Sequence, residues 1–249
     1  MASVTQHYAE HLGPIYEWML GDFDTAMDAA RTDLRAANIV DGVERVAVDL
    51  GTGLGTHAIA LAEAGFRVIA IDTCASLLEA LGRRNRSGLA ITAVQADLQQ
   101  FRQHSGGRVD VVACMGDTLT HLASRDSVNR LLKTIATALA PGGTFVTTFR
   151  DYSADPLEGN CRVIPVRQGD DRILTCVLEY HTKTLTVHDV VHERINGGWN
   201  FRVSSYPKLR LSPTWVQSTL SDLGLTFATG TTAQGMVRLA AARPMTISW

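Results

Sequence analysis

Residues 45–55 read RVAVDLGTGLG, and this stretch decides the fold. Its first six residues are a short apolar run with a carboxylate, Asp49, near its end, which is typical of a buried strand. The glycines that follow permit a tight turn, and residues 56–65, THAIALAEAG, repeat apolar positions at helical spacing up to Gly65. The stretch therefore predicts a strand, a turn and a helix.

The same alternation continues up to residue 150. Further strands are expected at 66–72, 91–97, 108–117 and 143–149, and further helices at 76–84 and near 126–139. The first of these helices is expected to begin near Ser76 as its N-cap. Strands that alternate with helices form a parallel, doubly wound sheet with right-handed crossovers.

After Arg150 the pattern changes to four strand-like runs with turn residues and no helix between them. They predict an antiparallel β insertion. A helix capped by Ser212, with Pro213 at its first position, and two last strands then complete the sheet. The expected fold class is α/β: a Rossmann-like doubly wound seven-stranded sheet with an antiparallel β insertion after the fifth strand.

The chain is expected to form a single domain over residues 1–249, because about 150 residues per domain is usual and no linker is visible. Within it we distinguish an N-terminal arm or lid, a cofactor-binding core, the β insertion, and a final helix with two strands. Their ranges are 1–30, 31–150, 151–211 and 212–249.

The composition is that of an ordinary globular protein, with 45% hydrophobic and 19% charged residues and a net charge of −2. No basic block is present, so nucleic acid is not an expected partner. No export signal and no run of 18 apolar residues is visible, so we expect a cytoplasmic protein without a membrane partner. The four cysteines are too widely spaced for a metal ribbon, and His188 and His192 lack a third ligand, so no metal is expected.

The glycine loop is the first candidate binding site. Gly51, Gly53 and Gly55 let a backbone approach a ligand closely and present the amides of the following helix. A dinucleotide-binding loop would carry a further glycine where Thr56 stands, which argues against NAD.

Three carboxylates accompany this loop. Asp49 precedes it and suits an amino-acid moiety, whereas Asp72 lies at the end of the next strand and suits a ribose diol. Asp97 closes the third strand in the same way. A generic Rossmann turn around a different nucleotide is the alternative.

The segments DLGTGLG, IAID and QADL resemble the cofactor half of class I S-adenosylmethionine-dependent methyltransferases, over roughly residues 45–150. The resemblance implies S-adenosyl-L-methionine as cofactor and S-adenosyl-L-homocysteine as product. The residues that it implies for cofactor binding are Asp49, Gly51, Thr52, Gly53, Gly55, Asp72, Thr73, Asp97 and Leu98. A closer resemblance, described next, adds Tyr16, Met115 and His121.

Three later segments, MGDTLTHL at 115–122, FRDY at 149–152 and FRVSSYPKLRLS at 201–212, resemble the glycine and sarcosine N-methyltransferase group in the same order. This resemblance implies that Arg150 would grip an acceptor carboxylate and that Tyr206 would approach from the insertion. The catalytic residues that it implies are His121, Asp117, Arg150 and Tyr206.

One departure from that group concerns Asp117, where its members carry asparagine. An added negative charge there favours a cationic or hydrogen-bond-donating acceptor over a simple carboxylate. If a base is used, His121, with an ordinary pKa of about 6.5, is a better candidate than Asp117.

We therefore expect an enzyme, an S-adenosylmethionine-dependent methyltransferase that acts on a small polar metabolite. The expected reaction is N-methylation of an amine or amino-acid-like acceptor by direct in-line displacement. Methylation of oxygen or carbon in a secondary metabolite, and cofactor binding without catalysis, remain as alternatives. The expected partner is a small-molecule acceptor, and a homo-oligomer is compatible with the sequence.

Overall fold

The computed structural model describes residues 2–85 and 88–245, and it contains two sheets. In the seven-stranded sheet the strand order is β10 (Thr226–Thr231), β11 (Val237–Ala242), β5 (Leu139–Phe149), β4 (Val109–Cys114), β1 (Val46–Leu50), β2 (Arg67–Asp72) and β3 (Ile91–Gln95). The second sheet has the order β6 (Val163–Gln168), β7 (Arg172–Tyr180), β8 (Thr184–Ile195) and β9 (Gly198–Leu209). The α/β class and the antiparallel insertion are thus confirmed. Met1 and residues 246–249, at the ends of the predicted arm and final segment, lie outside the described residues.

The parallel arrangement expected for the alternating strands is confirmed, and the last two strands, for which no direction was predicted, are antiparallel. Strands β5, β4, β1, β2 and β3 are parallel neighbours, but β11 is antiparallel to both β5 and β10. Only residues 232–236 join β10 to β11, and a connection this short allows a hairpin but no crossover helix. The sheet is therefore mixed.

Helices cover both faces of the large sheet. α3 (Phe23–Ala36) and α4 (Thr56–Glu63) pack on one face, while α7 (Arg125–Ala138) and α8 (Pro213–Asp222) pack on the other. Because successive residues of a strand point to opposite faces, Ala47 of β1 joins the first layer and Val48 the second. Within the described residues, no helix is long and apolar enough to cross a membrane.

The predicted cap of the helix after β2 is wrong by two residues. α5 (Ala75–Arg84) has Cys74, not Ser76, at its N-cap position. Asp72 sets this start, because its carboxylate accepts a 2.9 Å hydrogen bond from the backbone N–H of Cys74. Ser76 lies within the first turn, where its hydroxyl is 3.3 Å from the Cys74 sulfur.

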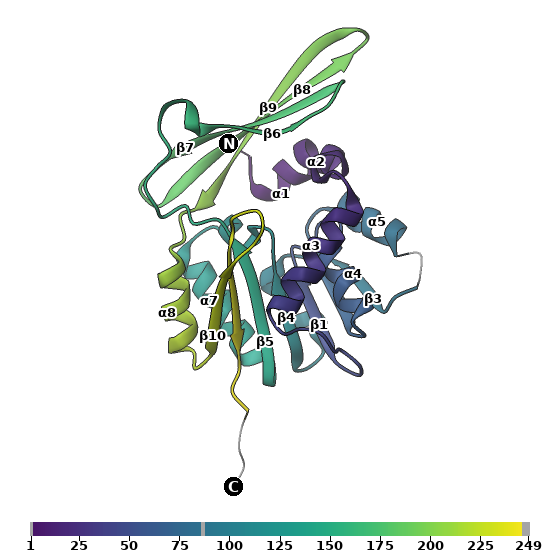
Figure 1. The fold of residues 1–249 in the computed structure, drawn as a ribbon, viewed down its shortest axis with the longest axis vertical. Helices are drawn as coiled ribbons and strands as arrows, with labels where there is room; N and C mark the ends of the chain where they lie inside the picture. Colours follow the sequence, from purple (N-terminus) through teal and green to yellow (C-terminus); the bar gives the residue numbers. More distant parts are fainter. Residues whose placement is uncertain (1, 86–87, 246–249) are drawn as a thin grey trace.

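The N-terminal arm lies between the second sheet and the core (Figure 1). Its helical segments are α1 (Val4–His7), η1 (Tyr8–Leu12), η2 (Gly13–Ile15) and α2 (Tyr16–Leu20). Leu12 and Ile15 form a buried cluster with Leu174 of β7 and Val191 of β8. Tyr8 and Tyr16 also pack against a second cluster that contains Leu54, so the arm bridges the two sheets.

Leu174→Ala should loosen the arm from the second sheet. Leu174 is 1% exposed, and truncation of a buried leucine costs about 2–5 kcal/mol. In hydrogen-exchange measurements, the amides of residues 4–20 should exchange faster than in the wild type, while those of β1 keep their rates. Ile164→Ala, at a position that is 37% exposed on β6, is the matched control and should leave the arm unchanged. Unaltered exchange of the arm in Leu174→Ala would show that this cluster does not hold it.

Candidate active site

The loop between β1 and α4 has a backbone that glycine adopts most readily. Gly51, Gly53 and Gly55 have φ angles of +71°, +54° and +83°. A Cβ on Gly51 would lie 2.5 Å from Cγ2 of Thr118, and one on Gly55 would overlap the side chain of Leu81. Close packing against Thr118 and Leu81 therefore requires glycine at positions 51 and 55, and the loop leads directly into the start of α4, whose backbone N–H groups can hold a ligand.

Two carboxylates are fixed beside this loop. Asp49 is buried and accepts a 2.7 Å hydrogen bond from the hydroxyl of Thr52, and burial raises the pKa of Asp49 to about 6. Asp72 accepts hydrogen bonds of 2.9 Å from the backbone N–H groups of Gly53 and Cys74. Burial also raises the pKa of Asp72, although these two bonds oppose the rise. The Asp72 carboxylate is thus anchored directly to the glycine loop.

Most of the other residues predicted to bind the cofactor also lie at the carboxyl ends of the parallel strands. Those that follow the ends of β2, β3 and β4 are Thr73, Asp97, Leu98 and Met115. Asp97 caps the short helix η3 (Leu98–Gln100) by accepting a 2.8 Å bond from the backbone N–H of Gln99. The ring of Tyr16 reaches the loop from the arm, 3.8 Å from where a Cβ on Gly53 would lie.

A tight turn after β4 buries the carboxylate of Asp117. Gly116 and Asp117 have φ angles of +67° and +76°. The Asp117 carboxylate accepts hydrogen bonds from the backbone N–H of Arg150 at 3.0 Å, the hydroxyl of Tyr152 at 3.1 Å and the ammonium of Lys208 at 2.5 Å. Burial alone would raise the pKa of Asp117, but Lys208 and these bonds hold it below its ordinary value. Asp117 is therefore ionised, with both oxygens bonded.

Lys208 is a site residue that the sequence analysis missed. It lies on β9 with a side chain that is 11% exposed, and its Nζ is 5.7 and 5.9 Å from the ring centres of Tyr152 and Tyr206. Burial would lower the pKa of Lys208, but the charge of Asp117 outweighs this effect and raises it. Lys208 belongs to the segment FRVSSYPKLRLS, but its partner is 91 residues away, so the spacing gave no signal.

Aromatic rings surround His121, the last residue of η4 (Thr118–His121). The ring centres of Tyr8 and Tyr206 each lie 5.6 Å from that of His121. Nε2 of His121 is shielded from solvent and has no hydrogen-bond partner among the residues that the structure describes. Burial, followed by the charge of Lys208, lowers the pKa of His121 to about 3. The imidazole is therefore neutral, and it is a weak base.

Two histidines that the sequence analysis did not single out fasten the arm to the second sheet. His7 lies 2.9 Å from a carboxylate oxygen of Asp189 through Nε2 and 2.8 Å from the hydroxyl of Ser204 through Nδ1. Nε2 of His11 lies 2.9 Å from the Asp189 carbonyl, and the Arg202 guanidinium lies 2.7 Å from Nδ1 of His11. These contacts place the tyrosines of the arm at the site.

Arg150 stands apart from the other predicted catalytic residues. Its backbone bonds to Asp117, but its side chain is exposed and donates to no residue within 2–85 and 88–245. Tyr206, by contrast, is 4% exposed and lies edge-on to His121. The structure thus gathers Asp117, His121 and Tyr206 and leaves the guanidinium at the surface.

The histidines of β8 lie outside this cluster. His188 contacts the hydroxyl of Ser205 at 2.8 Å and the carboxylate of Glu179 at 3.2 Å, and the His192 ring lies 6.0 Å from that of Phe201. In the described part of the chain, no group of three or more His, Cys, Asp or Glu side chains is arranged to hold a metal ion.

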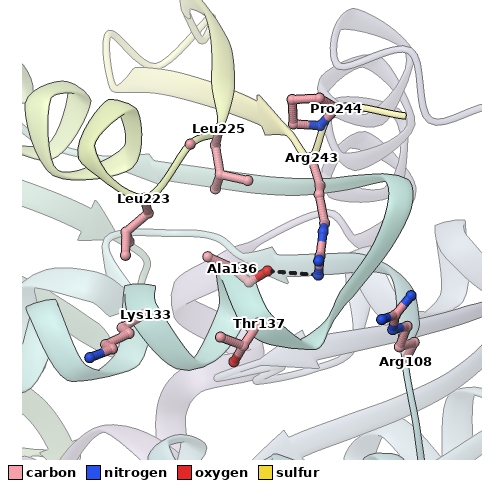
Figure 2. Close-up of a pocket in the computed structure, with 9 residues that line it drawn as sticks. Arg108, Lys133, Ala136, Thr137, Leu223, Leu225, Arg243 and Pro244 are labelled. Atoms are coloured by element: carbon pink, nitrogen blue, oxygen red, sulfur yellow. Dashed lines mark hydrogen bonds between the residues drawn. The ribbon is translucent and has the colours of Figure 1, made fainter. Parts of the chain in front are cut away.

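A surface hollow of about 390 Å³ lies near the amino-terminal ends of β4 and β5, away from the glycine loop (Figure 2). Arg108, which precedes β4, and Thr137, which lies near the start of β5, are among its lining residues. Arg243 also lines it, and its guanidinium donates to the carbonyl of Ala136 at 3.3 Å. Ligands of open α/β sheets bind at the carboxyl ends of the strands, so this hollow is not the candidate active site.

Comparisons with known proteins agree with this arrangement. Residues 47–143 match the methyltransferase domain family. A glycine/sarcosine N-methyltransferase from Halorhodospira halochloris is 30% identical, over 59% of this chain and 56% of the relative. A cypemycin N-terminal methyltransferase from a Streptomyces species is 34% identical, over 53% of each chain. The solved structure of CalS10 with bound S-adenosylmethionine, an amino pentose methyltransferase from Micromonospora echinaspora, superposes with a TM-score of 0.72 at 17% identity, over 94% of this chain and 97% of that one.

The chain spans about half the length of the curated relatives that it matches. At 17% identity, the likeness to the solved structure shows the fold alone. The matched range 47–143 includes the glycine loop, Asp72, Asp117 and His121. Residues 47–143 thus match the methyltransferase domain family, and the chain shares the fold of the solved methyltransferase structure.

Proposed function

We propose that this chain transfers the methyl group of S-adenosylmethionine to the nitrogen of a small-molecule amine. The observation that carries the proposal is that the glycine loop and Asp72 lie at the same sheet edge as the buried groups around His121. A ligand in the loop would therefore point one end toward that cluster. The two curated relatives are named as an N-methyltransferase and an N-terminal methyltransferase, which supports nitrogen as the target atom.

The residues present fit this cofactor. A side chain at Gly53 would occupy the space between the loop and the ring of Tyr16, and the Asp72 carboxylate keeps lone pairs for two ribose hydroxyls. Asp49 and Thr52 would hold the methionine end, and Tyr16 would cover the loop. When bound, the cofactor supplies a methyl group on a positively charged sulfur, which is already activated toward attack.

The part of the protein in such a reaction is to position the amine and to exclude water. Proximity and orientation can supply about 7–11 kcal/mol of a barrier. Neither expected base is poised to take a proton, because His121 is a weak base and both Asp117 oxygens are bonded. The acceptor amine would therefore bind as its free base, and the rings of Tyr8 and Tyr206 would orient it.

Asp72→Ala should weaken binding of S-adenosyl-L-homocysteine. Loss of hydrogen bonds to a charged acceptor costs about 1–3 kcal/mol, and the substitution also frees the Gly53 amide from its 2.9 Å bond. Titration calorimetry with both proteins measures the change. Asp155→Ala removes an exposed carboxylate and should bind like the wild type. Equal affinity of Asp72→Ala and wild type would contradict the assignment of this loop.

Incubation with cofactor tritiated at the methyl group should label amines and not phenols. A suitable panel holds free amino acids, an amino acid amide, a peptide with a free N-terminus, an amino sugar and a phenol. Transfer to nitrogen is expected because the site offers no base strong enough to ionise a phenol. Label on the phenol alone would indicate O-methylation. Binding of S-adenosyl-L-homocysteine without label on any compound would indicate a protein that binds the cofactor and does not catalyse transfer.

His121→Phe should make stability less dependent on acidic pH. The folded protein holds the pKa of His121 at about 3 against about 6.5 when unfolded, so below pH 6.5 the unfolded chain binds a proton that the folded protein refuses. Stability then falls as the pH falls. Urea unfolding at pH 6 and pH 5 should show a loss in wild type that exceeds the loss in His121→Phe by about 1 kcal/mol. His104→Phe, at an exposed position, should behave like wild type, and equal losses in all three proteins would disprove this role of burial.

A further inference from the structure

We propose that Lys208 is a specificity-determining residue of this site. Its ammonium donates to an uncharged oxygen, a hydroxyl or an amide carbonyl, which the acceptor carries next to its amine. The ion pair that Lys208 forms with Asp117 at the same time disfavours acceptors with a free carboxylate. The inference rests on the proposed function, because it concerns the acceptor of that reaction.

The first observation is that most of the donor capacity of Lys208 is unused. An ammonium has three N–H donors, and among the described residues only Asp117 accepts from it. The rings of Tyr152 and Tyr206 flank Nζ at 5.7 and 5.9 Å and offer no conventional acceptor there. The Lys208 side chain is only 11% exposed, so its two remaining N–H groups favour a further oxygen acceptor, which the described residues do not supply.

The second observation is that Lys208 and His121 both lie close to the ring of Tyr206. The Tyr206 ring centre lies 5.9 Å from Nζ of Lys208 and 5.6 Å from the ring of His121. Nε2 of His121 is also buried without a partner among the described residues. One unpaired nitrogen and one ammonium with unused N–H groups around the same ring indicate a place for a ligand that carries both a nitrogen and an oxygen.

The third observation concerns Asp117, which acts through Lys208 and not on the acceptor. Arg150, Tyr152 and Lys208 already donate to three of the about four lone-pair sites of its carboxylate, and the charge of Lys208 compensates its negative charge. The expectation that its negative charge selects a cationic acceptor therefore does not follow from this geometry. Asp117 is a positioning residue that fixes the ammonium.

The charge balance separates the classes of acceptor. Asp117 and Lys208 cancel, and the nearby imidazole of His121 is neutral. The other buried carboxylate of this region, Asp189, lies 2.9 Å from Nε2 of His7 and supplies no positive charge that could compensate an acceptor carboxylate. An acceptor carboxylate would thus bring an uncompensated negative charge into a buried place, whereas an uncharged oxygen takes the same hydrogen bond without that cost. The charge of Arg150 also acts on Tyr152, but the Arg150 side chain is exposed, so solvent screens it.

Four amines of similar size test the inference, each assayed with tritiated cofactor: glycinamide, ethanolamine, glycine and ethylamine. They carry an amide carbonyl, a hydroxyl, a carboxylate and no oxygen next to the amine. For wild type we expect kcat/KM for glycinamide or ethanolamine to exceed that for ethylamine and for glycine by about tenfold or more, as one hydrogen bond to a charged donor provides. The comparison of glycinamide with ethanolamine distinguishes a carbonyl from a hydroxyl. A wild type that prefers glycine or ethylamine, or that binds S-adenosyl-L-homocysteine and labels none of the four, overturns the inference.

Two variants then test whether Lys208 selects the acceptor or only neutralises the charge of Asp117. Asp117→Asn leaves the ammonium unpaired, so the ratio of kcat/KM for glycine to that for glycinamide should rise about tenfold. Asp117→Asn combined with Lys208→Met removes both charges and should bring the oxygen-bearing amines level with ethylamine. The double variant keeps the test valid if the single variant folds poorly, since it buries no unpaired charge. Unchanged ratios in both variants would mean that the pair is only structural.

Two controls make the outcome unambiguous. Lys183→Met carries the same substitution at an exposed lysine in the turn between β7 and β8, and it should keep the wild-type ratios. Calorimetry with S-adenosyl-L-homocysteine on each protein reports on the cofactor site alone. If the wild type does not bind S-adenosyl-L-homocysteine, the proposed function is refuted. If it binds and the kcat/KM ratios of both variants equal those of the wild type, only the role of Lys208 is refuted.

Discussion

The buried ion pair of Asp117 and Lys208 joins the two sheets of this protein. Asp117 lies at the end of a core strand and Lys208 on the last strand of the second sheet, and Tyr152, at the start of the insertion, bonds to the same carboxylate. Removal of one member of a buried pair typically costs about 3–5 kcal/mol, because it leaves a charge without a partner. The position of the second sheet is therefore tied to the turn that carries the candidate active site.

A neighbouring arginine reinforces this joint without taking part in the ion pair. The Arg210 guanidinium donates to the carbonyls of Tyr152 at 2.7 Å, His181 at 2.9 Å and Ala154 at 3.1 Å. These three carbonyls belong to the connection out of the core and to the turn between β7 and β8. Charged hydrogen bonds at several points fix the insertion in place. Its side chains can therefore hold a bound ligand in a defined orientation.

Features that depend on residues close together in the sequence could be predicted, whereas features that depend on distant residues could not. The loop from Gly51 to Gly55 and the place of Asp72 at the end of the next strand were predictable, because strand, turn and helix leave a local pattern of apolar residues and glycines. The cap of α5 was missed by two residues, because a side chain outside the helix, that of Asp72, determines where the helix begins. Propensity alone favoured the serine at position 76.

The contacts that complete the site could not be predicted in the same way. His7 and Asp189 are 182 residues apart, and Asp117 and Lys208 are 91 residues apart. Neither pair has a spacing that marks it, since such contacts depend on how the second sheet and the arm fold back onto the core. The resemblance to N-methyltransferases named Asp117 and His121, but the charge that neutralises Asp117 became visible only in three dimensions.

The arm carries residues that reach both parts of the site. Tyr16 lies against the glycine loop and Tyr8 lies against His121, and the two tyrosines are only eight positions apart in the chain. A ligand that contacts Tyr16 and another that contacts Tyr8 would both stabilise the same seated position of this one segment. Linkage then requires each ligand to raise the affinity of the other by the same factor, so the arm makes the two binding equilibria reciprocal.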